Sequence, residues 1–163
     1  MFGPRNLLGI YLNDHLAGAT LGAQLARRLA ASHRDWPSNA DLVRVATEVD
    51  QDRTALLEIM AALDVPVVRV KVYAGWAAEK AARLKLNGRL LRPSPLSGLV
   101  ELEALRLGVE GKAAGWRTLR TVAEHEHRLD IPALDTLMAR AKAQSDTLER
   151  IRTRAVDHLF GSV

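Results

Sequence analysis

Three acidic side chains that could act as metal ligands or acid–base groups, Glu48, Asp50 and Asp52, lie close together in ATEVDQDRTALLEIM, residues 46–60. The spacing of the apolar residues around them is typical of an amphipathic helix. Asp50 has Arg53 about one helical turn away, which favours an ion pair on the solvated face. Asp52 shares the apolar stripe, so we expect its carboxylate inside the protein, with Glu48 beside it.

Three further polar side chains, His15, Glu101 and His158, also fall on apolar stripes of predicted helices. A buried carboxylate without a partner is costly, or its pKa rises until it is neutral, so each acid needs a partner. Counting helical rise from the predicted hairpin turns places Asp52 within about one turn of His15. The same count places Glu101 close to His158, so each acid has a histidine as its predicted partner.

Two interpretations of these side chains stay open. One is a non-standard metal site for iron, manganese or zinc, because carboxylates and imidazoles are suitable donors for these ions. Its ligands would be drawn from His15, Glu48, Asp52, Glu101 and His158. The other is a pair of buried acid–histidine hydrogen bonds that fix the register of the helices and perform no chemistry.

Other kinds of site find little support in the sequence. The absence of cysteine excludes disulfides, thiolate metal sites and cysteine nucleophiles. His125 and His127 are two residues apart, so on a helix they point in different directions and cannot chelate one ion together. No glycine-rich phosphate loop occurs, and Ser94 and Ser97 have no nearby histidine and acid in a recognisable order. We therefore expect no cofactor other than a transition metal ion, and the sequence identifies no small-molecule substrate.

The elements that would position these residues are helices. The sequence has few of the β-branched clusters and Asn-Gly turns that strands and hairpins require, and the apolar residues recur every three to four positions. The sequence predicts one all-α domain over residues 1–163. We expect four long helices and a shorter one between the second and third, spanning 5–32, 39–63, 67–86, 95–126 and 131–160.

Capping signals set several of these boundaries. Ser38, three residues before Asp41, resembles a capping arrangement for the second long helix. Asp130 can cap the last helix, and Pro66 disfavours continuation of the second helix through the residue before it. Two antiparallel hairpins joined by a connection of about 30 residues are the topology of a four-helix bundle with one long crossover.

This order of helices resembles that of the ferritin-like superfamily. The stretches YLNDHLAGA, 11–19, and RLKLNGRLL, 83–91, are also similar to those of uncharacterised bacterial proteins. The resemblance implies an inward-facing dimetal motif with a Glu-x-x-His on each of two helices. The corresponding slot on the second helix has Gln51 in place of histidine, and the last helix has Asp146 to Glu149 without histidine, so the motif is degenerate.

Two pairs of glycines lie four residues apart inside predicted helices, Gly18 with Gly22 and Gly111 with Gly115. Glycine within a helix costs about 0.5–1 kcal/mol relative to alanine, so some gain must offset it. Close packing of helices or a tight dimer interface is one explanation. Room for an apolar ligand between the first and third long helices is the other.

The segment between the two hairpins is strongly basic. It carries Arg69, Lys71, Lys80, Arg83, Lys85, Arg89 and Arg92 against one acid, Glu79, whereas the whole chain has a net charge of +4. Such a basic amphipathic segment can bind an anionic membrane surface or nucleic acid. Alternatively, its apolar face packs over the bundle and its basic side faces water.

Together these patterns predict a non-enzymatic association or binding protein that forms a homodimer. The N-terminal apolar run is too short for a membrane span and has no cleavage site typical of an export signal, so we expect a cytoplasmic protein. A divergent metal-binding oxidoreductase or metal-handling protein is the first alternative. Attachment to an anionic membrane or to nucleic acid through the basic segment is the second.

Overall fold

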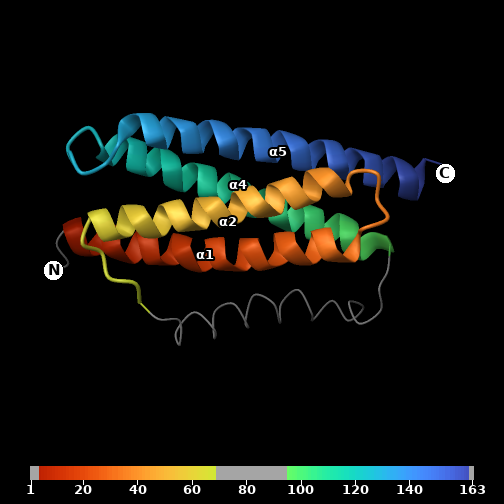
Figure 1. Ribbon diagram of the computed structural model, residues 1–163, viewed down its shortest axis with the longest axis horizontal. Coiled ribbons are helices and arrows are strands. Elements are labelled where there is room, and N and C mark those ends of the chain that lie inside the picture. The colour runs from red at the N-terminus through yellow and green to blue at the C-terminus, as the bar shows by residue number, and fades with distance from the viewer. Residues whose placement is uncertain (1–3, 69–94, 162–163) are drawn as a thin grey trace.

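The computed structural model describes residues 4–68 and 95–161, which form four helices and, within those ranges, no strand. The helices are α1 (Pro4–Ser32), α2 (Asn39–Ala62), α4 (Pro95–Val122) and α5 (Ile131–Phe160). Figure 1 shows that α1 and α2 form one antiparallel hairpin and that α4 and α5 form another. The predicted all-α class and the four long helices are confirmed.

The two hairpins pack against each other mainly through α1 and α4, whereas α2 and α5 touch over a shorter length. α2 ends and α4 begins at opposite ends of the bundle, so these two helices run parallel (Figure 1). Between the helices lies one continuous apolar core. Its largest fully buried side chains include Leu12, Leu29, Leu42, Met60, Leu102, Leu119, Leu134, Leu148 and Ile151.

One helix is shorter than its sequence pattern predicts. The helix expected to reach residue 126 ends at Val122. The amides of Glu124 and His125 bond to carbonyls only three residues back, which tightens the chain into a turn. The carboxylate of Glu126 then accepts hydrogen bonds from the backbone and side chain of Arg128. These local bonds compete with helical ones and end the helix early.

The two predicted caps have different outcomes. Asp130 caps α5 as expected, because its carboxylate accepts a hydrogen bond of 3.2 Å from the backbone N–H of Ala133. Ser38 occupies the N-cap position of α2, but its side chain makes no capping hydrogen bond. Its hydroxyl instead accepts a 3.0 Å bond from Arg154. The predicted capping role of Ser38 is therefore wrong, and the residue joins the α1–α2 turn to the end of α5.

The end of α2 is fixed by local backbone geometry. Asp64 adopts a left-handed conformation, with φ of 55°, directly after the helix. The next N–H, that of Val65, bonds at 2.9 Å to the carbonyl of Met60, which satisfies a carbonyl that the helix end would leave free. The helix thus stops before Pro66, as its sequence predicts.

The chain after α2 is held along α1 by Asn13, a buried residue. Its side-chain amide donates to the carbonyls of Gly9 (2.8 Å) and Pro66 (3.1 Å), and its carbonyl accepts from the N–H of Val68 (2.8 Å). One side chain therefore satisfies two backbone groups of a segment outside any helix. Residues 67 and 68 are not helical, so the predicted short helix does not begin there.

The remainder of that predicted helix, 69–86, lies outside the described residues. The same is true of the whole predicted anionic-partner surface, Arg69, Lys71, Lys80, Arg83, Lys85, Arg89 and Arg92. Both stay predictions.

Candidate functional site

Asp52 is the centre of a buried polar cluster that joins three helices. It projects from α2 into the bundle and is 1% exposed. Its Oδ2 accepts hydrogen bonds from the ammonium of Lys112 on α4 and, at 3.1 Å, from Nε2 of Gln144 on α5. Its Oδ1 contacts the guanidinium of Arg140, also on α5. One carboxylate thus links the second helix to both helices of the other hairpin.

The cluster extends through Gln144, which is also 1% exposed. Oε1 of Gln144 accepts a 2.5 Å hydrogen bond from Lys112, and its Nε2 donates to Glu48 at 3.2 Å. Two carboxylates, those of Glu48 and Asp52, therefore face two cations, those of Lys112 and Arg140. Burial lowers the pKa of Lys112, and the nearby Asp52 carboxylate opposes that shift. We call these five side chains the Asp52 cluster.

The buried position predicted for Asp52 is confirmed, but its predicted partner is wrong. The cations that neutralise it are Lys112 and Arg140, not His15. The predicted pairing of Glu101 with His158 is also wrong. Glu101 forms a 3.0 Å ion pair with Arg28 on α1, and His158 is exposed to solvent. Pairing by position along the axis therefore identified neither the partner side chain nor the helix that carries it.

Asp50 lies on the outside of α2, as predicted, although its ion pair differs from the expected one. Its carboxylate is 2.6 Å from the guanidinium of Arg27 on α1. Arg53, the predicted partner, donates instead to the hydroxyl of Thr20. The outer face of this hairpin is thus connected by side chains that cross between its two helices.

The five predicted metal ligands do not form a metal centre. Asp52 and Glu48 accept hydrogen bonds from protein donors, and Glu101 and His158 lie elsewhere. His15 lies in a cleft on α1. Within residues 4–68 and 95–161, no group of three or more histidines and acids is placed to hold an ion. The donor set present also contains a buried ammonium and a guanidinium, which repel a cation.

The sequence analysis missed three members of the cluster, Lys112, Arg140 and Gln144. A signal for Lys112 exists, because it lies three residues after Val109 and four before Trp116 on the apolar stripe of its helix. Gln144 is placed in the same way on α5. A search of both helices for every polar residue on the apolar stripe, and not only for metal ligands, would have found Lys112 and Gln144.

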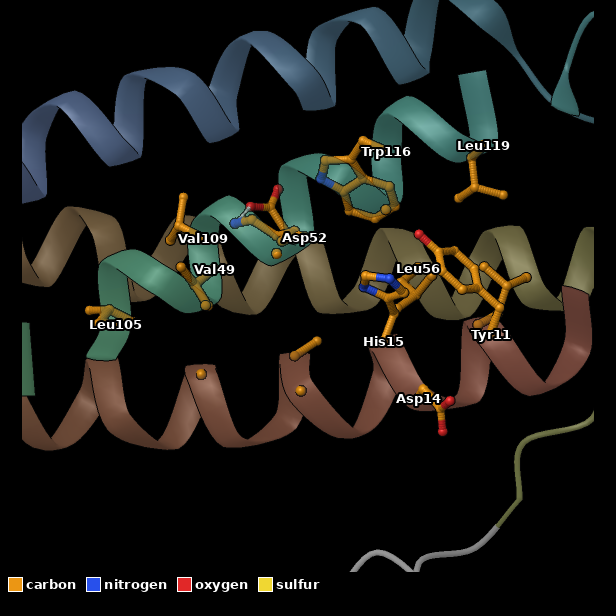
Figure 2. Close-up of a pocket in the computed structure, with 18 residues that line it drawn as sticks. Tyr11, Asp14, His15, Val49, Asp52, Leu56, Leu105, Val109, Trp116 and Leu119 are labelled. Carbon is orange, nitrogen blue, oxygen red and sulfur yellow. Dashed lines mark hydrogen bonds and ion pairs between the residues drawn. The ribbon is translucent and has the colours of Figure 1, made fainter. Parts of the chain in front are cut away.

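A cleft of about 460 Å³ lies beside the cluster, between α1 and α4, with α2 behind it (Figure 2). Its wall is mostly apolar and includes Leu12, Val49, Leu56, Val109, Trp116 and Leu119. Asp52 and Lys112 also contribute to the wall. The cleft therefore borders the region where the Asp52 cluster joins α4 to α2.

Glycines from both helices face this cleft. A Cβ atom built on Gly18, Gly22, Gly108 or Gly111 has no described atom within 4 Å outside its own immediate backbone. The predicted close packing at Gly18, Gly22 and Gly111 is therefore wrong within the described part of the chain. Gly115 does fit that prediction, because a Cβ there would lie 3.0 Å from the ring of His15.

The cleft wall contains a buried polar donor, the indole N–H of Trp116. Trp116 is 3% exposed, and its indole N–H has no hydrogen-bond acceptor among the described residues. In Figure 2 the indole nitrogen lies on the side of the ring toward Asp52. Buried polar groups of proteins are normally hydrogen-bonded, so an unsatisfied donor in a cleft wall needs an explanation.

His15 and Tyr11 form the polar part of the α1 wall. Their rings pack edge to face with centroids 4.4 Å apart, and the hydroxyl of Tyr11 forms a 3.0 Å hydrogen bond with that of Thr118 on α4. Burial lowers the pKa of His15, although the charge of Asp14 opposes the shift. His15 therefore presents a neutral imidazole to the cleft at neutral pH.

The site combines a cluster whose charged groups pair with one another and an apolar cleft whose wall carries the indole N–H of Trp116, a donor without an acceptor among the described residues. Such an arrangement suits binding better than acid–base catalysis, because the charged groups already hold one another. None of the four described helices has an apolar stretch able to cross a membrane. Comparisons with the profiles of known protein families, with curated proteins and with solved structures each gave no match.

Proposed function

We propose that this chain is a non-enzymatic binding protein whose cleft between α1 and α4 takes up a small apolar molecule. The observation that carries the proposal is the set of four glycines that face open space among the described residues, Gly18, Gly22, Gly108 and Gly111. Each costs about 0.5–1 kcal/mol relative to alanine, or about 2–4 kcal/mol for the four. Alanine would fit at each position without a clash, so the glycines lower the stability of the helices and leave the cleft wider than alanine would.

The cleft has the size and character of a ligand site. Pockets for small molecules commonly have volumes of about 300–1,000 Å³ and apolar walls with few polar groups. The volume of about 460 Å³ falls in this range. Trp116 adds a large aromatic surface to the wall, which favours apolar ligands.

The ferritin-like assignment belongs to the same proposal. It is supported by the parallel course of α2 and α4, since helices that end and begin at opposite ends of a bundle need a long connection (Figure 1). Metal handling is not part of the proposal, because the five predicted ligands do not meet. Formation of a homodimer and a cytoplasmic location stay predictions.

The test fills the cleft from its glycine side. We expect Gly111→Leu to abolish binding of hexylbenzene, measured by titration calorimetry, and to leave the melting temperature unchanged or higher. Leucine has a better helix propensity than glycine by about 0.5–1 kcal/mol, and its side chain enters open space. Ala139→Leu is the matched control, because Ala139 is exposed on α5, away from the cleft.

Two results would contradict the proposal. If the wild-type protein does not bind hexylbenzene, the cleft is not a site for apolar molecules. If Gly111→Leu lowers the melting temperature by several degrees while Ala139→Leu does not, another part of the chain or a second copy already occupies the cleft.

A further inference from the structure

We infer that the ligand is a neutral molecule with a carbonyl oxygen, and that this oxygen accepts a hydrogen bond from the indole N–H of Trp116. The inference rests on the proposed function and specifies the chemistry of the ligand. It joins the cleft to the buried donor in its wall.

The first step concerns the donor. An indole N–H can only donate, and Trp116 is almost fully buried without an acceptor among the described residues. Leaving a buried donor unpaired costs free energy, whereas phenylalanine would give an apolar ring without that cost. Tryptophan at this position is explained if the acceptor arrives with the ligand.

The second step concerns charge. A charged ligand entering an apolar cleft needs a free counter-ion. The ammonium of Lys112 already donates to Asp52 and Gln144, and the guanidinium of Arg140 already contacts Asp52. Burial also keeps His15 neutral. Among the residues that the structure describes, no cation near Trp116 is therefore left to neutralise an anion, and the buried carboxylate of Asp52 is likewise occupied, so a neutral ligand fits best.

The third step concerns orientation. Figure 2 shows Leu105 and Val109 on one side of the cleft and His15 and Tyr11 on the other, with Trp116 above His15. A ligand whose carbonyl meets Trp116 can extend its apolar part toward Leu105. The open glycines of α1 and α4 lie along that path.

The test compares two probes that differ by one group, hexanophenone and hexylbenzene, in which a C=O replaces a CH₂. We expect the wild-type protein to bind hexanophenone more tightly, and Trp116→Phe to weaken that binding about fivefold to tenfold, the usual effect of one hydrogen bond. Binding of hexylbenzene should change by less than about twofold in this variant, because the ring surface is retained. In a proton–nitrogen spectrum, the indole signal that Trp116→Phe removes should move downfield with hexanophenone and not with hexylbenzene.

The outcomes separate this inference from the proposed function. If both probes bind, but the indole signal moves equally with each and Trp116→Phe weakens neither selectively, the inference fails and the apolar site stands. If neither probe binds, both fail. If 6-phenylhexanoate, the anionic probe, binds more tightly than hexanophenone at neutral pH, the conclusion that the ligand is neutral is overturned.

Discussion

Replacing Asp52 with asparagine tests whether the buried cluster is held together by charge. Asparagine keeps the shape of the side chain but leaves the ammonium of Lys112 and the guanidinium of Arg140 without an anion at this position. Removing one partner of a buried ion pair costs about 3–5 kcal/mol. Arg140 is 30% exposed and can turn toward water, whereas Lys112 is 13% exposed and cannot do so easily. We therefore expect Asp52→Asn to lower the free energy of unfolding by about 3 kcal/mol, near the lower limit of that range.

The assay is urea unfolding followed by circular dichroism, with the slope of the transition checked for constancy. For a protein of this size, a loss of about 3 kcal/mol corresponds to a fall of roughly 6–12 °C in melting temperature. Asp146→Asn is the control, because the ion pair of Asp146 with Lys142 is exposed to solvent and contributes little to stability.

A second variant distinguishes loss of charge balance from loss of packing. In Asp52→Asn combined with Lys112→Met, the unpaired ammonium is gone, so the double variant should regain at least about 1 kcal/mol over Asp52→Asn alone. If Asp52→Asn costs less than about 1 kcal/mol with an unchanged slope, or if the second substitution makes the protein still less stable, the interpretation of the cluster is incorrect.

Two further predictions concern α1. Asn13→Ala should lower the free energy of unfolding by about 1–3 kcal/mol, measured by urea unfolding, because backbone groups of Pro66 and Val68 lose their partner; an unchanged midpoint would show that water replaces the amide. The second prediction is a pH dependence. The pKa of His15 is below its ordinary value of 6.5 in the folded protein, so the unfolded chain takes up the proton first as the pH falls. The stabilisation of the folded state by neutral His15 is complete above pH 6.5 and declines below it, and this decline should be smaller in His15→Gln. The charged groups of the cleft wall around His15 are Asp14 on α1, Asp52 on α2 and Lys112 on α4. Equal pH profiles of stability for the two proteins would contradict the assignment.

The long helices could be predicted because their information is local. Apolar spacing, the cap at Asp130 and the break before Pro66 each act within a few residues, and each appears in the structure. The early end at Val122 was missed for a related reason. The apolar pattern continues past it, but the competing bonds of Glu126 with Arg128 depend on side-chain geometry that spacing does not describe.

The partners of buried charges could not be predicted in the same way. Local neighbours correctly indicated that Asp52 is internal, because no cation lies one turn away on its own helix. Its actual partners come from two other helices, at separations of 60 and 88 residues. Axial position alone selects a level of the bundle, whereas the partner also depends on the rotation of each helix about its axis. A search restricted to histidine excluded the lysine and arginine that occupy those positions.

The cluster and the cleft are physically related through α4. Lys112 extends toward Asp52 and Gln144, while its neighbour Gly111 faces the open side toward α1. Glycines on facing helices normally allow the backbones to approach closely. Here the ion pairs of the Asp52 cluster attach α4 to α2 and α5, so closure onto α1 would require buried charges to separate, at a cost of several kcal/mol. The polar interior thereby keeps open a cleft that hydrophobic packing alone would tend to close.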